Sequence, residues 1–179
     1  MLFDRFFWPF GVLSCSSQET FLFINTMIDD ENFRILLPLA CLWAEEKESI
    51  ILRDGVPLTT AQLEDAKTIG VTHPKKIRLL KVPVVPMPEN EILFAAAVYY
   101  QLISPETRGL TLRYGIFIRA DSWDVRELVF HELVHTSQYE RLGSVEPFLQ
   151  RYLRECIAFG YPNGSLEQEA INTTKALCI

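Results

Sequence analysis

The segment that most constrains this chain is His131-Glu132-Leu133-Val134-His135, which lies within a stretch, 125–142, that predicts a helix ending at Gly143. Residues four apart share one face of a helix, so both imidazoles can reach a single ion. Glu132 is rotated by roughly 100° from His131, which lets its carboxylate contact a bound water without binding the metal. Chance would produce this pattern only about 0.004 times in a chain of this composition.

Paired neutral imidazoles favour zinc, and a catalytic zinc usually takes a third protein ligand while leaving one position open for water. A metzincin site is excluded, because Arg141 stands where that pattern needs a histidine and Gln138 where it needs a glycine. The sequence has no segment that would supply a deformylase-type cysteine ligand, and no second ExxH that a di-iron site would need. The third ligand is therefore expected to be a later glutamate. The candidates are Glu140, Glu146, Glu155, Glu167 and Glu169.

Position along the chain narrows these candidates. Glu140 is on the same helix as the histidines and too close to fold over them, and Glu146 and Glu155 are expected to face solvent. Glu167 and Glu169 follow Ser165, which begins a capping-box pattern with Gln168 and so predicts the start of a last helix. The last helix can pack back against the 125–142 helix that carries the histidines. Either Glu167 or Glu169 could then be the third ligand.

The order of predicted elements indicates an α+β domain. Helices are expected at 29–48, 60–69, 89–102, 125–142, 146–159 and 165–177, and strands at 76–85 and 110–119. Asp121-Ser122 is expected to cap the 125–142 helix. The strand that precedes this helix is expected to be an edge strand, which could hold an extended peptide through main-chain hydrogen bonds.

The run HELVHTSQYERLG (131–143), then FLQRYLREC, then GYPNGSLEQEA (160–170), resembles the small, largely uncharacterised gluzincin-type zinc metallopeptidases of bacteria. The resemblance covers about residues 73–171. It implies a compact, minimal zincin-like fold with an edge strand on the HExxH helix and a C-terminal glutamate helix. It also implies that Glu167, three residues before Ala170, binds the metal, with Glu169 as its rival. Ile171 departs from the family, which places an acidic partner for a histidine ligand there.

These observations together predict a zinc-dependent metallopeptidase that hydrolyses peptide bonds of a peptide or protein substrate. His131, His135 and Glu167 would hold zinc, and Glu132 would be the general base. Among the tyrosines, Tyr161 is the preferred candidate to stabilise the oxyanion. Gln138 would reach the rim of the site or hydrogen-bond the edge strand, or it would lie on the surface. The alternative is a zinc-binding structural or interaction module without catalysis.

Charge and hydropathy limit the other partners. A net charge of −6 and a pI of about 5.1 argue against a nucleic-acid binder, and no apolar run reaches the ~18 residues that a membrane span needs. The 179 residues suit one domain, with an aromatic N-terminal segment at 1–28. Its apolar stretch before Cys15 is similar to a weak lipoprotein signal, but Pro9 interrupts it, so a cytoplasmic location is favoured over export.

Overall fold

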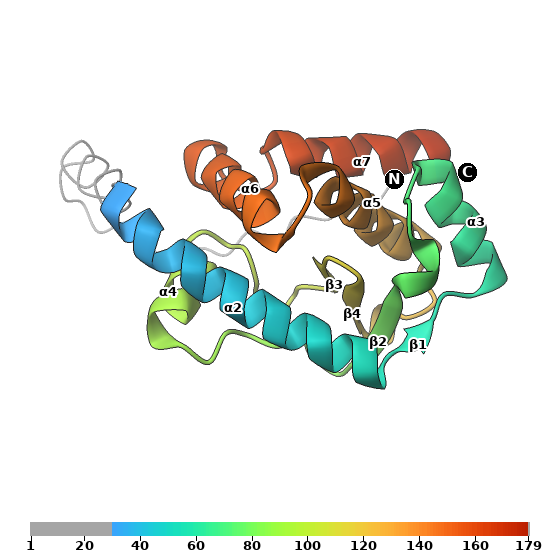
Figure 1. Cartoon of the computed structure of the whole chain (residues 1–179), viewed down its shortest axis with the longest axis horizontal. Helices are drawn as coiled ribbons and strands as arrows, with labels where there is room; N and C mark the ends of the chain where they lie inside the picture. Colours follow the sequence, from blue (N-terminus) through green and yellow to red (C-terminus); the bar gives the residue numbers. More distant parts are fainter. Residues whose placement is uncertain (1–29, 179) are drawn as a thin grey trace, which may run out of the picture. The chain divides into compact units, whose positions relative to one another are not determined.

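The computed structural model describes residues 30–178 and divides the chain into two compact units, 1–34 and 35–179. Cys15 and the 1–28 segment lie outside the described residues. The second unit contains the whole candidate site. Within the described residues the fold is α+β, with helices around a small mixed sheet (Figure 1). No helix among them is both long and apolar enough to cross a membrane.

The helices lie where the sequence predicts them, although the first extends to Asp54 beyond its expected end at 48 and the third is shorter than the expected 89–102. They are α2 (Asp30–Asp54), α3 (Thr60–Ile69), α4 (Glu91–Tyr99), α5 (Arg126–Leu142), α6 (Val145–Phe159) and α7 (Ser165–Leu177). The end of α3 shows why: Gly70 takes a left-handed conformation with φ 92° and its N–H closes the last turn, as a glycine at this position allows. The expected cap of α5 is wrong, since Asp121-Ser122 forms a short 3-10 helix (Ala120–Ser122) and Val125 precedes α5.

The sheet contains β1 (Val56–Pro57), β2 (Arg78–Val82), β3 (Gly109–Leu112) and β4 (Gly115–Arg119), in the order β1-β2-β4-β3. β2 and β4 are parallel, whereas β3 and β4 form an antiparallel hairpin. The single strand expected at 110–119 is therefore wrong: a turn at Arg113, where φ is 59°, divides it. The strand next to α5 in sequence, β4, is internal, and the edge strands are β1 and β3.

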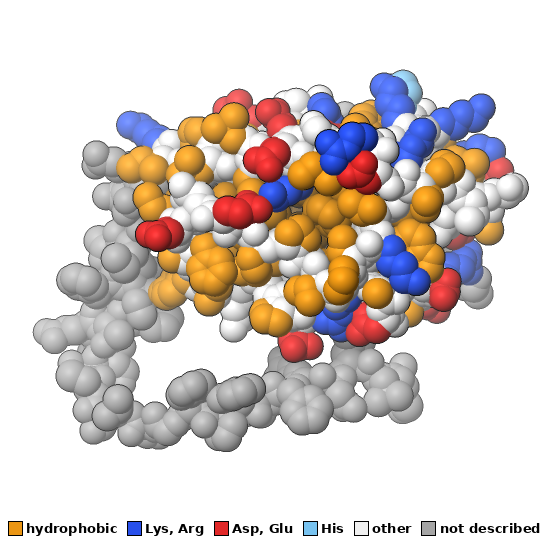
Figure 2. Space-filling view, turned by 90° about the horizontal axis from the view of Figure 1, so that it is seen from below, with side chains coloured by type: hydrophobic (Ala, Val, Ile, Leu, Met, Phe, Trp, Pro, Cys, Tyr) orange, Lys and Arg blue, Asp and Glu red, His pale blue; other side chains and the backbone are white. Residues whose placement is uncertain are grey.

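α2 buries a stripe of residues three or four apart, the pattern of an amphipathic helix. The stripe consists of Leu37, Ala40, Ala44, Lys47, Glu48 and Ile51. Glu48 and Ile51 lie beside Gly115 of β4. α2 and α4 also carry exposed apolar residues, among them Leu42 and Phe94. Figure 2 shows the face that carries α2, where hydrophobic side chains gather among charged ones. Burial of the inner stripe, rather than of the whole surface, thus holds α2 in place.

α5 lies between the sheet and α7. On one side its Val129 and Leu133 pack with Ile116 and Ile118 of β4, and on another its Phe130 and Val134 pack with Ala170 of α7. Burial of this apolar surface fixes the rotation of α5 about its own axis. The helix that carries the HExxH residues is therefore held against both the sheet and the last helix.

Candidate metal centre

α5 places the two motif histidines on one face, one turn apart. Their ring centroids are 4.8 Å apart, and their Nε2 atoms are 3.1 Å from each other. The His135 side chain is 9% exposed and that of His131 19%. The pair therefore points inward, with His131 nearer to solvent.

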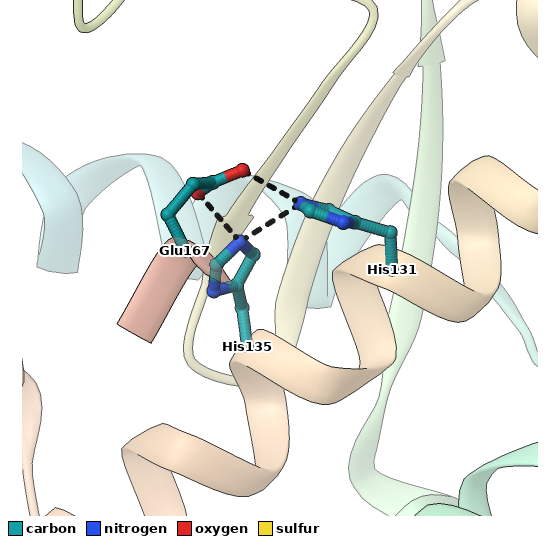
Figure 3. A group of neighbouring side chains, drawn as sticks. All are labelled: His131, His135 and Glu167. Atoms are coloured by element: carbon teal, nitrogen blue, oxygen red, sulfur yellow. Dashed lines mark hydrogen bonds and ion pairs between the residues drawn. The ribbon is translucent and has the colours of Figure 1, made fainter. Parts of the chain in front are cut away.

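Glu167, near the start of α7, faces both histidines. Its Oε1 lies 3.2 Å from Nε2 of His131, and its Oε2 lies 3.3 Å from Nε2 of His135. Figure 3 shows the three side chains converging, two from α5 and one from α7. Each offers one ligand atom, and these atoms lie within 4.8 Å of one another.

These separations suit a small divalent cation. Zinc–nitrogen bonds of 2.0–2.1 Å at tetrahedral angles place neighbouring ligand atoms about 3.3 Å apart. The separations of 3.1–3.3 Å between facing atoms are close to that value. Two imidazoles and one carboxylate are also a donor set that zinc accepts, although other transition metals accept it as well. The three residues therefore form a group that could hold a divalent metal ion.

The electrostatics of the cluster favour a negative Glu167. Its burial raises the pKa of its carboxyl group, but hydrogen bonds with His131 and His135 outweigh this and leave the pKa well below its ordinary value. Burial lowers the pKa of His135, and the hydrogen bond and charge of Glu167 raise it above its ordinary value. A divalent cation among these groups would take over the stabilising role of the histidine protons.

Glu169, the rival third ligand, is directed elsewhere. It makes a two-pronged ion pair with Arg141 of α5, with N···O distances of 2.8 and 2.7 Å. The other glutamates are also remote from the metal cluster: Glu140 accepts the backbone N–H of His73 at 2.9 Å, and Glu146 is exposed. Of the candidate glutamates, only Glu167 is brought to the histidines.

Glu155, expected to face solvent, instead holds the start of α7. Its carboxylate accepts the backbone N–H of Leu166 at 2.8 Å and the hydroxyl of Ser165 at 2.6 Å. The expected capping box is wrong, because Gly164 precedes the helix and no local side chain caps it. A carboxylate from α6 satisfies the free N–H instead, as helix starts require. α6 thereby positions the helix turn that carries Glu167.

Gln138 is fully buried behind His135, so the surface alternative is wrong. Its Oε1 lies 2.8 Å from Nδ1 of His135, and its Nε2 donates to the carbonyl of Leu166 at 2.8 Å and to Glu169 at 3.2 Å. Position 171, where the resemblance expects an acidic residue, is Ile171, and the Nδ1 partner of His135 is the amide of Gln138.

Glu132 points away from the rings toward the edge strand. Its Oε2 accepts the hydroxyl of Thr111 at 2.6 Å. A Cβ at Gly109 would collide with the Glu132 carboxylate, so a larger residue there would displace this side chain. Gly109 and Thr111 are two residues apart and face the same side of β3. Glu132 is also close enough for its charge to contribute to the raised pKa of His135, after burial and Glu167.

Two tyrosines contact the Glu167 carboxylate. Tyr152 of α6 donates to Oε2 at 2.9 Å, and Tyr161, from the loop before α7, donates to Oε1 at 3.5 Å. Tyr161 is 44% exposed. Phe148 and Tyr152 also pack edge-on against the His135 ring, with centroid distances of 6.3 and 5.8 Å. Tyr139 is in the core, where its hydroxyl donates to the carbonyl of Thr111 at 3.4 Å.

Sequence reasoning named Tyr152 only as a candidate oxyanion donor, not as a partner of Glu167. It did not find Gly109, Thr111 or the capping role of Glu155. Gly109 reads as a turn marker and Thr111 as one position of an alternating strand, and neither pattern indicates a contact with Glu132. The alternation places Thr111 opposite the apolar face of the expected strand, so the sequence carried no signal of its burial against Glu132.

Comparisons of the chain with protein-family models, with curated proteins and with solved structures found no significant match. The chemistry of this centre therefore has to be argued from its own residues, their separations and their burial.

Proposed function

We propose that this protein is a zinc-dependent hydrolase that cleaves peptide bonds, a metallopeptidase of the gluzincin kind. The observation that carries the proposal is the convergence of His131, His135 and Glu167, with facing atoms 3.1–3.3 Å apart, beside a buried Glu132. Glu132 is 5% exposed and its charge acts on His135, while its carboxylate is held by the hydroxyl of Thr111.

The histidines and Glu167 would hold the ion, since their donor atoms already face one another. When bound, zinc would lower the pKa of a coordinated water toward neutrality and polarise a substrate carbonyl. Glu167 would contribute one negative charge, leaving a net positive site that attracts electron-rich carbonyl oxygens.

Glu132 would act as the general base. Its neighbour Thr111 holds one carboxylate oxygen at 2.6 Å, which fixes the direction of the other. In this role Glu132 takes a proton from the attacking water and later gives it to the leaving amine. Tyr161, which is partly exposed at the cluster, would donate its hydroxyl hydrogen to the developing oxyanion.

The edge position of β3 supports a peptide as the substrate. β3 lies at one end of the four-stranded sheet, so its outer side has no strand partner in the described fold. It also carries Thr111, which contacts the proposed base. An extended peptide paired with this edge would lie beside Glu132, because main-chain hydrogen bonds would align it along the strand.

The test combines metal analysis with a Glu132→Gln variant, which keeps the shape of the side chain and removes the base. The wild-type protein should contain one zinc per chain and cleave a mixture of unstructured peptides. Glu132→Gln should keep the metal and lose at least about 100-fold in cleavage rate.

Wild-type protein without metal would contradict the proposed site. Metal that is retained with no cleavage of any peptide would contradict the hydrolase and favour a catalytically silent zinc-binding module.

A further inference from the structure

We propose that Gln138 is a positioning residue, which holds His135 in the tautomer that presents the Nε2 lone pair to the metal site. The inference rests on the metal centre proposed above, and it assigns a role to buried residues behind that centre. It starts from the contacts of the Gln138 side chain, which touches α5 and α7 but none of the candidate reacting groups.

The orientation of the Gln138 amide follows from its partners. An amide side chain has one end that donates and one that accepts, and its hydrogen-bond network decides which is which. The carbonyl oxygen of Leu166, 2.8 Å away, has no hydrogen and can only accept. The end of Gln138 that faces Leu166 and Glu169 must therefore be the NH₂ group, and its oxygen must face His135.

The orientation of the amide in turn decides the protonation of His135. A carbonyl-type oxygen 2.8 Å from Nδ1 requires a hydrogen on that nitrogen. A neutral imidazole carries one hydrogen, so Nε2 is left with its lone pair. This is the nitrogen that lies 3.1 Å from His131 and 3.3 Å from Glu167.

The same contacts connect the tautomer to α7. Leu166 directly precedes Glu167, so Gln138 holds one ligand and the residue next to another. Arg141 and Glu169 complete the arrangement, because their ion pair keeps a second acceptor 3.2 Å from the Gln138 NH₂ group. A neutral amide thus does what an acidic partner at Ile171 would do elsewhere, without adding negative charge to the site.

The direct test is made on the wild-type, zinc-loaded chain by long-range ¹H–¹⁵N NMR of the histidine rings, which shows the nitrogen that carries hydrogen. Only three histidines contribute, and the ring of His73 contacts Tyr114 rather than the site. We expect His135 to carry its hydrogen on Nδ1 and to bind through Nε2. Binding through Nδ1, with the hydrogen on Nε2, would overturn the inference.

A second test measures zinc affinity by competition with a chelator at one fixed pH. Gln138→Leu keeps a buried side chain of similar size but cannot accept from His135, and we expect about 10- to 100-fold weaker zinc binding. Gln150→Ala, a change of an exposed glutamine on α6, is the matched control and should leave affinity unchanged. Thermal unfolding of each metal-free variant checks that it is folded.

A double variant distinguishes positioning from simple packing. In Gln138→Glu with Glu169→Gln, the new carboxylate can accept from both His135 and the new amide but loses the hydrogen bond to the Leu166 carbonyl. Affinity should therefore recover only in part, to within about tenfold of wild type. Gln138→Leu with Glu169→Gln has no acceptor and should stay weak. Equal affinity in both double variants would contradict the positioning role.

The outcomes also separate this inference from the proposed function. If wild type binds zinc and Gln138→Leu binds it equally well, the positioning role is wrong while the metal centre stands. If wild type binds no zinc at all, both are wrong. If Gln138→Leu does not fold, the NMR measurement on wild type decides the matter alone.

Discussion

Tyr152 and Tyr161 donate to different oxygens of Glu167, yet their surroundings give them different roles. Tyr152 packs against His135 and donates at 2.9 Å, so it supports a ligand. Tyr161 is partly exposed and its hydroxyl is 3.5 Å from the carboxylate, so it is free to turn toward a substrate. Their roles can therefore be separated by removing one hydroxyl at a time.

Tyr152→Phe should weaken zinc binding by about 10-fold, because Glu167 loses its closest hydrogen-bond donor. Tyr161→Phe should leave zinc affinity unchanged but lower kcat by about 100-fold, since the oxyanion loses a donor. Chelator competition and peptide cleavage measure the two effects. The reverse assignment, with Tyr161 controlling affinity and Tyr152 controlling turnover, would contradict these roles.

Thr111 tests whether the edge strand orients the proposed base. Thr111→Val removes the hydroxyl that donates to Glu132 at 2.6 Å and keeps the shape of the side chain. Peptide cleavage should slow by about 10- to 100-fold while zinc content stays at the wild-type value, because misplacing a reacting group costs rate rather than metal. Thr68→Val, on the exposed side of α3, should change neither quantity.

At the scale of elements, α7 depends on α6 for its first turn. Glu155 accepts the Leu166 N–H and the Ser165 hydroxyl, and the adjacent Gly164 leaves only 2.9 Å between its Cβ position and the Cβ of Glu155. Glycine at this position allows the two helices to approach closely, and this approach brings the Glu155 carboxylate to the first turn of α7. Because Glu167 lies in that turn, its position depends on both Gly164 and Glu155.

Glu155→Ala should therefore lower the free energy of unfolding by about 1–2 kcal/mol, the usual effect of removing a helix cap. Urea unfolding of the metal-free protein measures it. Glu146→Ala removes an exposed glutamate from the same helix and should change stability by less than about 0.5 kcal/mol. Equal effects of the two substitutions would show that Glu155 does not cap α7.

The hairpin of β3 and β4 is held by a contact from α2. Glu48, buried, receives a two-pronged ion pair from Arg113 and the backbone N–H of Tyr114 at 3.0 Å. This explains how a non-glycine residue keeps φ 59° at the turn. It also explains why the turn could not be predicted: alternation continues through it, no Asn-Gly or Asp-Gly pair marks it, and its partner is 65 residues away.

At the scale of the whole molecule, features that depend on local sequence patterns could be predicted, whereas features that depend on contacts between distant parts of the chain could not. The end of α3 at Gly70 and the four-residue spacing of His131 and His135 are local features that the sequence displays. The choice of Glu167 over Glu169 depends on how α7 packs on α5. The role of Gln138 depends on partners 28 and 31 residues away, which no local pattern contains.

The stability of the metal-free molecule should have a maximum in pH. Lowered carboxyl pKa values, as at Glu155 and Glu89, stabilise the fold above the ordinary value of about 4.3, and this stabilisation is lost as pH falls through the lowered values. The raised pKa of His135 stabilises the fold below the ordinary value of about 6.5, and that contribution is lost as pH rises through the raised value.

The free energy of unfolding, measured by urea titration at a series of pH values, should therefore decrease both at acidic and at alkaline pH. Glu167→Gln should remove most of the fall on the alkaline side, because the His135 proton loses its charged partner. A wild-type alkaline fall that persists unchanged in Glu167→Gln would contradict the assigned pairing.

The most direct measurement of the central claim is the zinc content of purified protein after dialysis against a metal-free buffer. We expect one zinc per chain in wild type and in Glu146→Ala, and its loss in Glu167→Ala, which removes the only candidate glutamate that faces both histidines. Wild-type protein free of zinc, or Glu167→Ala with a full zinc content, would contradict the claim.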